Sequence, residues 1–178
     1  MDLILEQWRR ERPDVDVAAL GTFARLIRAV DLAERILGER LRPFGLQPGW
    51  FDLLAALRRS GEPYELNPTG LMRATLLSSG GMTKRLDRMV DAGLIERRPD
   101  PDDRRGTLVR LTRKGRSLID RAVESHAASE EELLQVLPAP DRRALDRLLS
   151  SLLEGLETTT DASPASATPS SSGRRARR

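Results

Sequence analysis

Apolar residues recur at spacings of three and four along most of this chain, which is the pattern of helices that bury one face. The longest early example predicts a helix over residues 16–42, ended by an arginine–proline pair. Its apolar stripe consists of Leu20, Phe23, Ile27, Val30, Ala33, Leu37 and Leu41. Further helices are predicted over residues 48–61 and from the asparagine–proline pair at 67–68, because asparagine caps a helix well and proline suits the first turn. Residues 62–66 leave room for one short strand.

The segment 77–112 carries the most informative pattern. We predict a helix that is capped by Ser78 or Ser79 and ends at Gly93, where a left-handed residue is favoured. Its apolar face is formed by Met82, Leu86, Met89 and Val90. Its opposite face carries Thr83, Lys84, Asp87, Arg88 and Asp91. The small residues at its front end, including Gly80, suit a helix whose narrow N-terminus enters the major groove and whose donors reach base edges and phosphates.

Two strands and a basic turn follow this helix. Residues 94–98 and 107–111 have the composition of antiparallel strands, and the turn at 99–106 is too polar to bury. Arg104 and Arg105 lie near its tip, where arginine suits a minor groove or a phosphate rail. Taken singly, a charged helix face is most often solvated and a proline-rich hairpin is most often a plain loop. The order helix, strand, basic turn and strand is more specific. It predicts a helix-turn-helix with a β-wing that binds double-stranded DNA.

Two more helices are predicted after the wing. The first is capped by Thr112, and the second starts near Asp141 after two prolines. The second has an unusually leucine-rich stripe, made of Leu145, Leu148, Leu149, Leu152, Leu153 and Leu156. A winged-helix core of about 65 residues closes without these helices or the one over 16–42, so their apolar faces must bury something else. A second copy of the chain is the economical partner, and packing within one chain is the alternative.

The two ends of the chain differ from its body in composition. Residues 2–12 are either a short helix, with Leu3, Leu5 and Trp8 on one face, or a frayed arm. Serine, threonine, alanine and proline dominate residues 158–178, which predicts a disordered basic tail. Its terminal arginines either touch DNA nonspecifically or only solubilise the chain.

The formal net charge of +3 is unevenly distributed. Residues 78–116 carry 11 Lys or Arg against 6 Asp or Glu, whereas residues 117–157 carry 4 against 9. Residues 1–77 balance at 11 each. Positive charge in the body of the chain therefore gathers on the segment predicted to read DNA, as phosphate binding requires.

Composition also excludes other classes of function. Without cysteine there is no disulfide, thiolate metal site or thiol switch, and one histidine, His126, cannot build a His-rich metal site. We interpret His126 as a packing or dimer contact, with pH or ligand sensing as the alternative.

Aromatic residues make up only 3% of the chain, which is too few for base-stacking RNA platforms. No catalytic motif is present, so we expect no enzyme and no cofactor. Without a signal peptide or an apolar run of about 20 residues, we expect a cytoplasmic protein without membrane association.

Residues 103–112 read DRRGTLVRLT, which resembles the wing signature of the MarR family of bacterial transcription regulators. The resemblance extends over about residues 3–157 and is most specific in the predicted reading helix and wing. It implies winged-helix dimers whose terminal helices form the dimer interface. The implied organisation is an N-terminal arm or short helix (1–15), a MarR-type domain (16–157) with a winged helix at about 46–112 and dimerisation helices at about 16–42 and 112–157, and the tail (158–178).

The phrases ILEQWRRERPD, FDLLAALRRSG and LLSSGGMTKRLDRM are similar to the urate-responsive, PecS-like branch of that family. This resemblance implies a ligand site made of Trp8, Asp52 and two arginines, for which Arg85 and Arg97 fit best by position. An aromatic ring can stack on a flat purine-like anion, and arginine offers it a bidentate fork. A neighbouring aspartate would form an ion pair with that arginine until the anion competes for the guanidinium group. The alternatives are a hydrophobic plug for Trp8, a surface ion pair for Asp52, and a wing ion pair of Arg85 with Asp103.

We therefore expect a mainly α fold with a small β-wing, in a homodimeric repressor that reads a pseudo-palindromic operator and is released by a small planar anion such as urate. The expected DNA contacts are Ser78, Ser79, Gly80, Thr83, Lys84, Arg85, Arg88, Arg104 and Arg105. A dimeric winged-helix module that binds protein instead of DNA is the principal alternative, and an enzyme is the weaker one.

Overall fold

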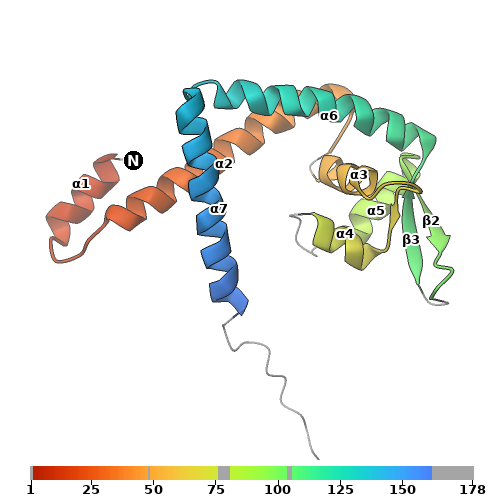
Figure 1. Ribbon diagram of the computed structural model, residues 1–178, viewed down its shortest axis with the longest axis horizontal. Coiled ribbons are helices and arrows are strands. Elements are labelled where there is room, and N and C mark those ends of the chain that lie inside the picture. Colours follow the sequence, from red (N-terminus) through yellow and green to blue (C-terminus); the bar gives the residue numbers. More distant parts are fainter. Residues whose placement is uncertain (1, 48, 76–80, 104–105, 162–178) are drawn as a thin grey trace, which may run out of the picture. The chain divides into compact units, whose positions relative to one another are not determined.

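The computed structural model shows a mainly helical chain with one small antiparallel sheet (Figure 1), which confirms the expected fold class. It describes residues 2–47, 49–75, 81–103 and 106–161. In chain order the elements are α1 (Asp2–Glu11), α2 (Ala18–Leu41), the 3-10 helix η1 (Arg42–Phe44), α3 (Trp50–Arg59), β1 (Glu65–Leu66), α4 (Pro68–Ala74), α5 (Met82–Asp91), β2 (Ile95–Pro99), β3 (Thr107–Leu111), α6 (Arg113–Leu134) and α7 (Ala139–Asp161). The chain divides into two compact units between Leu133 and Leu134.

The core of the first unit is formed by α3, α4, α5, the sheet and the first half of α6. Its fully buried large side chains are Leu53, Leu54, Leu57, Leu71, Met89, Ile95, Val109 and Ile119. All are aliphatic or methionine and lie on the apolar faces of their elements, so the predicted stripes of the winged helix are confirmed. Val90 is the exception, because it is 36% exposed at the edge of α5.

The sheet has the strand order β1-β3-β2. In the wing hairpin Ile95 lies opposite Leu111 and Pro99 opposite Thr107. The two-residue β1 pairs with β3 on its other side, where Glu65 lies opposite Arg110. The short strand expected before the helix-turn-helix therefore joins the wing sheet.

Both predicted side-chain caps outside α5 are confirmed. Asn67 accepts a hydrogen bond from the amide of Gly70 at 2.7 Å and starts α4. Thr112 Oγ1 accepts from the amide of Gly115 at 3.0 Å and donates to the carbonyl of Gly93 at 2.7 Å. Thr112 therefore ties the start of α6 to the residue that ends the recognition helix.

The first turn of α6 also packs tightly on the base of the wing. A Cβ atom at Gly115 would lie 2.0 Å from the carbonyl oxygen of Leu94. Only glycine fits this close approach of two backbone segments. The position of α6 is thus fixed by backbone contact as well as by the Thr112 cap.

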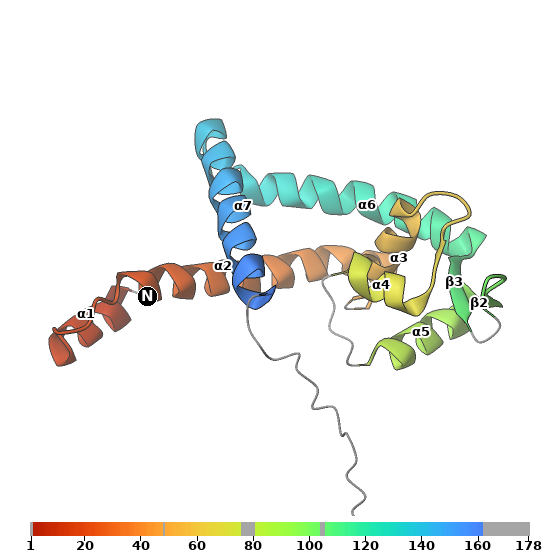
Figure 2. The same ribbon diagram turned by 60° about the horizontal axis from the view of Figure 1, so that its bottom comes forward.

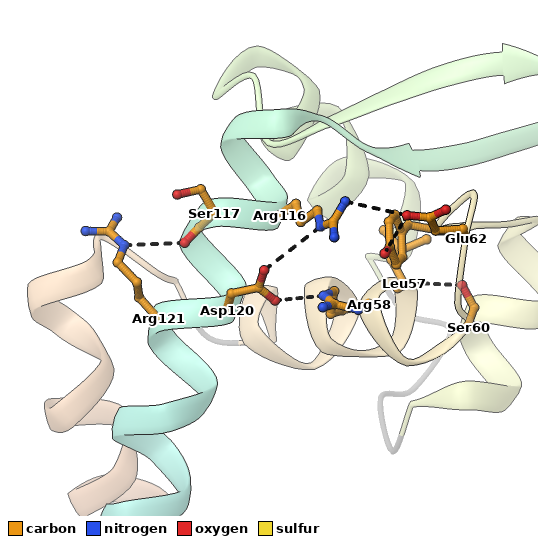
Figure 3. Close-up of polar contacts among 9 residues, drawn as sticks. Leu57, Arg58, Ser60, Glu62, Arg116, Ser117, Asp120 and Arg121 are labelled. Atoms are coloured by element: carbon orange, nitrogen blue, oxygen red, sulfur yellow. Dashed lines mark hydrogen bonds and ion pairs between the residues drawn. The ribbon is translucent and has the colours of Figure 1, made fainter.

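A charged cluster joins α6 to α3 and to the turn between α3 and β1 (Figure 3). Asp120 accepts a hydrogen bond from Arg58 Nε at 2.7 Å, and this bond raises the pKa of Arg58. The guanidinium carbons of Arg58 and Arg116 lie 5.0 and 4.6 Å from the ring centre of Tyr64. Arg116 also approaches Glu62 and Asp120, at 3.8 and 4.0 Å. Charge and cation–π contacts therefore add to the apolar packing that holds α6 against the winged helix.

Several large apolar side chains of the long helices are exposed. In α2 they are Leu20, Phe23, Ile27, Val30 and Ile36. In α7, which belongs to the second unit, they are Leu145, Leu148, Leu152, Leu153 and Leu156. These are the surfaces that the sequence pattern assigned to a second copy of the chain. Exposed apolar rows of this length mark interaction surfaces.

Two predicted boundaries are wrong. α5 begins at Met82 after Gly81, whose φ of 78° is left-handed, and no side chain caps it. A left-handed residue ends the helical path, so Ser78 and Ser79 precede the true cap; with Gly80 they lie outside the described residues.

At the other end α7 continues to Asp161, although the tail was expected from Thr158. Thr158, Thr159 and Thr160 each donate a hydroxyl hydrogen bond to the carbonyl four residues earlier, at 2.8, 2.8 and 2.9 Å. Threonine is a weak helix former, but this back-bonding satisfies its hydroxyl within a helix. The rest of the predicted tail, residues 162–178, lies outside the described residues.

Candidate nucleic-acid interface

α5 presents a polar face beside the wing. Its buried residues are Met82, Leu86 and Met89, so helical geometry turns Thr83, Lys84 and Arg88 outward, where all three are exposed. Figure 2 shows the C-terminal end of α5 meeting the strands of the wing. Within the described part of the chain, Lys84 and Arg88 form no ion pair, so both cations are open to an anion.

Arg85 lies between the two faces of α5. It is partly buried, and its Nη1 is enclosed without a hydrogen-bond partner among the described residues. The side chain is therefore placed differently from Lys84 and Arg88, which project into solvent. A buried guanidinium nitrogen without a partner is energetically costly.

Arg97 pairs with the recognition helix. Its Nη1 lies 2.7 Å from Oδ1 of Asp87, which joins β2 to α5. The carboxylate that holds Arg97 is thus Asp87 and not Asp52. Both side chains are about half exposed, so the pair adds little stability and mainly sets the spacing of helix and wing.

The wing turn is closed by backbone hydrogen bonds. The amide of Asp100 donates to the carbonyl of Gly106 at 3.1 Å, and the amide of Gly106 donates to the carbonyl of Asp103 at 2.8 Å. Arg104 and Arg105, which come between Asp103 and Gly106 in the sequence, lie outside the described residues. Their role in DNA binding remains a prediction.

The proposed ligand residues Trp8 and Asp52 are not brought together within one protomer. α1 is a helix, as one interpretation of the N-terminus predicted, and its Leu5 packs on Gly21 near the start of α2. Trp8 is 47% exposed there. Asp52 is exposed in the first turn of α3, which follows the far end of α2 (Figures 1 and 2). A helix of 24 residues spans about 36 Å, so the two side chains cannot share a small ligand in this chain.

His126 packs between helices. Its ring centre lies 4.2 Å from that of Phe51 in α3, and its Nε2 lies 3.3 Å from Glu130 in the next turn of α6. The packing interpretation is confirmed, and sensing is untested.

Two features were missed in the sequence. The Asp87–Arg97 pair connects a helix to a strand, for which no fixed spacing exists. A cavity beside α6 has Lys114 and Arg121 on its lining, and their separation of seven residues on one helix face was an available signal. Among the described residues no group of three acidic or histidine side chains could hold a metal ion, and no helix has the length and apolarity needed to cross a membrane.

A helix-turn-helix followed by a β-hairpin wing, which the short strand β1 extends to a three-stranded sheet, defines the class of winged-helix transcription regulators. Comparison with known proteins agrees with this class. The model of the MarR family matches residues 44–106. The chain is 37% identical over 146 residues to the transcriptional regulator PecS of Dickeya dadantii, covering 82% of this chain and 88% of PecS. It is 31% identical to the multiple antibiotic resistance protein MarR of Escherichia coli, covering 74% of this chain and 90% of MarR.

A solved structure resembles most of the chain. A mutant of E. coli MarR complexed with operator DNA has a TM-score of 0.68 at 29% identity and covers 78% of this chain and 99% of its own. The chain therefore belongs to the MarR family of transcriptional regulators. Of these two relatives, PecS is named as a transcriptional regulator.

Proposed function

We propose that this protein is a homodimeric repressor that reads a pseudo-palindromic operator and is released by a small planar anion such as urate. The observation that carries the DNA-binding part is the free cationic face of α5, formed by Lys84 and Arg88, beside the wing. The N-terminal residues of a helix presented in this way reach base edges in the major groove. The structure of a MarR relative with operator DNA supports the same use of the fold. A transcription regulator must reach the chromosome, so we place this protein in the cytoplasm.

The test is a mobility-shift titration with the DNA upstream of the protein's own gene. We expect Arg88→Ala to weaken binding by about 10- to 100-fold, because one charge-assisted contact to a base or phosphate is lost. Arg113→Ala removes another exposed cation, at the start of α6, and should leave binding unchanged. Equal affinities for the two variants would contradict the assignment. The double change of Arg104 and Arg105 to alanine should also weaken binding.

Dimerisation is supported by the exposed leucines of α7. Leu152→Glu places a charge in this row, and Ser150→Glu places the same charge on the opposite face of the helix. Light scattering should give twice the chain mass of 19.8 kDa for the parent and the Ser150 variant, and about one chain mass for the Leu152 variant. A monomeric parent protein at micromolar concentration would overturn the proposal.

The proposed release by urate is supported by the resemblance to the urate-responsive, PecS-like branch and by the position of Arg97 between the wing and the recognition helix. Because Trp8 and Asp52 lie apart in one chain, they can share a ligand only if Trp8 is supplied by the second copy. A shift that is insensitive to urate would retain the DNA-binding function and remove this ligand. A protein that is folded and dimeric but binds no operator in a genome-wide search would instead be an interaction module.

A further inference from the structure

The recognition helix α5 ends in a Schellman motif. Gly93 is left-handed, and its amide donates to the carbonyl of Val90 at 2.8 Å. The amide of Leu94 donates to the carbonyl of Met89 at 3.0 Å. These bonds satisfy carbonyls inside the helix, so the next carbonyls along the chain, those of residues 92–94, need partners from elsewhere in the protein.

Two residues at the start of α6 supply those partners. Lys114 Nζ donates to the carbonyl of Ala92 at 2.8 Å. Thr112 Oγ1 donates to the carbonyl of Gly93 at 2.7 Å, and the Thr112 amide donates to the carbonyl of Leu94 at 3.1 Å. Lys114 forms no ion pair within the described part of the chain, so no carboxylate draws it from this bond. Its ammonium group also lies at the negative end of the α5 dipole, where a cation is stabilised.

The contact of Lys114 differs in kind from its neighbours. Thr112 also caps α6, and the backbone at Gly115 meets Leu94, so both residues hold α6 against the base of the wing. The side chain of Lys114 is exposed, and it reaches Ala92, the C-terminal cap residue of α5. We propose that Lys114 is a positioning residue for operator reading, because its bond to Ala92 fixes the direction of α5 relative to α6.

This role acts through the helix and needs no contact between Lys114 and DNA. α5 has 10 residues and is about 15 Å long, and Lys114 bonds the end opposite to the turn proposed to enter the major groove. Hydrogen bonds to base edges depend on the direction of the helix, whereas phosphate contacts carry no sequence information. A helix that is already held in place also loses less conformational freedom on binding. The inference rests on the proposed use of α5 in the major groove.

The test compares Lys114→Met with Lys114→Arg. Methionine keeps an unbranched chain but has no donor, and arginine restores a charged donor. Arg113→Met is the matched control, since it removes the neighbouring exposed cation, for which no hydrogen bond to α5 is found among the residues that the structure describes. Fluorescence anisotropy at several salt concentrations measures binding to the DNA upstream of the protein's own gene and to an unrelated duplex of equal length.

We expect Lys114→Met to bind the operator about tenfold more weakly, the lower end for loss of a hydrogen bond to a charged group. Its affinity for the unrelated duplex should change by less than about twofold, because phosphate contacts dominate there. The slope of log affinity against log salt should stay unchanged, whereas loss of a phosphate contact would reduce it by about 0.9. Lys114→Arg and Arg113→Met should bind the operator like the parent.

Three results would overturn the positioning role. A reduced salt slope, or an equal loss on both duplexes, would make Lys114 a phosphate contact. A Lys114→Met variant that keeps the parent's preference for the operator and loses only its resistance to urea would make Lys114 a contributor to fold stability alone.

Amide hydrogen exchange on the free protein tests the contact without DNA. Residues 92–94 should exchange faster in Lys114→Met and at the parent's rate in Lys114→Arg, because the end of α5 opens more often once the bond is lost. Unchanged exchange in Lys114→Met would refute the bond itself. A parent that shows this exchange response but binds no operator would instead contradict the proposed function, and the reading role of Lys114 with it.

Discussion

Replacing Gly115 by alanine tests the contact between α6 and the base of the wing. The added Cβ would lie 2.0 Å from the carbonyl oxygen of Leu94 and 2.9 Å from its carbonyl carbon. Both are backbone atoms, so no side-chain rotation relieves the clash, and α6 or the wing must move by more than about 1 Å. Overpacking costs about 1–3 kcal/mol, and displacement of the Thr112 cap costs about 1 kcal/mol more.

Alanine is the better helix former by about 1 kcal/mol, which works in the opposite direction. We expect the free energy of unfolding of Gly115→Ala to fall by about 1–3 kcal/mol overall. The assay is urea unfolding followed by circular dichroism at one fixed protein concentration, because dimer stability depends on concentration. Gly38→Ala is the matched control, since nothing lies within 4 Å of a Cβ there, and it should be neutral or slightly stabilising. Unfolding of Gly115→Ala at or above the urea midpoint of the parent would refute the close approach.

Three further changes have defined outcomes. Asn67→Ala removes the cap of α4 and should lower the free energy of unfolding by about 1 kcal/mol in urea titrations, with serine at this position as the rescue. Gly21→Ala places a Cβ 2.8 Å from Leu5 Cδ1, so α1 should loosen, and faster amide exchange confined to α1 would report it; unchanged exchange would contradict the contact. The hydrogen bond from Arg40 lowers the pKa of Glu132, so this pair stabilises the fold above the ordinary glutamate pKa and the effect is lost as pH falls through the lowered value. Glu132→Gln should therefore lower stability slightly at neutral pH and not in acid, and an equal loss at both would refute the assignment.

The local structure of the winged helix could be predicted where one residue decides it. Asn67 and Thr112 cap helices because their side chains satisfy free backbone amides, and the alternating residues of the wing fix its strands. The start of α5 could not be read in this way. Ser78 and Ser79 are residue types that favour a helix N-cap, and the nearby Gly81 adopts a left-handed conformation. Capping propensity alone does not decide which of these residues precedes the first turn of the helix.

The candidate site was less predictable than the fold. The polar face of α5 follows from helical periodicity, so Lys84 and Arg88 were placed correctly on the exposed side. The partner of Arg97 was not, because a contact between a helix and a strand depends on their packing angle. The distance between Trp8 and Asp52 depends on where α1 packs along α2, which a pattern of residue types does not encode.

The Asp87–Arg97 ion pair has a consequence for how DNA is selected. It joins the helix proposed to enter the major groove to a strand of the wing proposed to contact the minor groove, so the two parts move together for as long as this contact holds. A DNA duplex that contacts both the helix and the wing must place its major groove and the neighbouring minor groove at the separation that the protein sets. A stiffer DNA sequence costs more deformation energy to reach this separation. Operator choice then depends on local DNA flexibility at base pairs that no side chain touches. Loosening the pair would broaden the range of accepted sequences before it weakened binding to the preferred one.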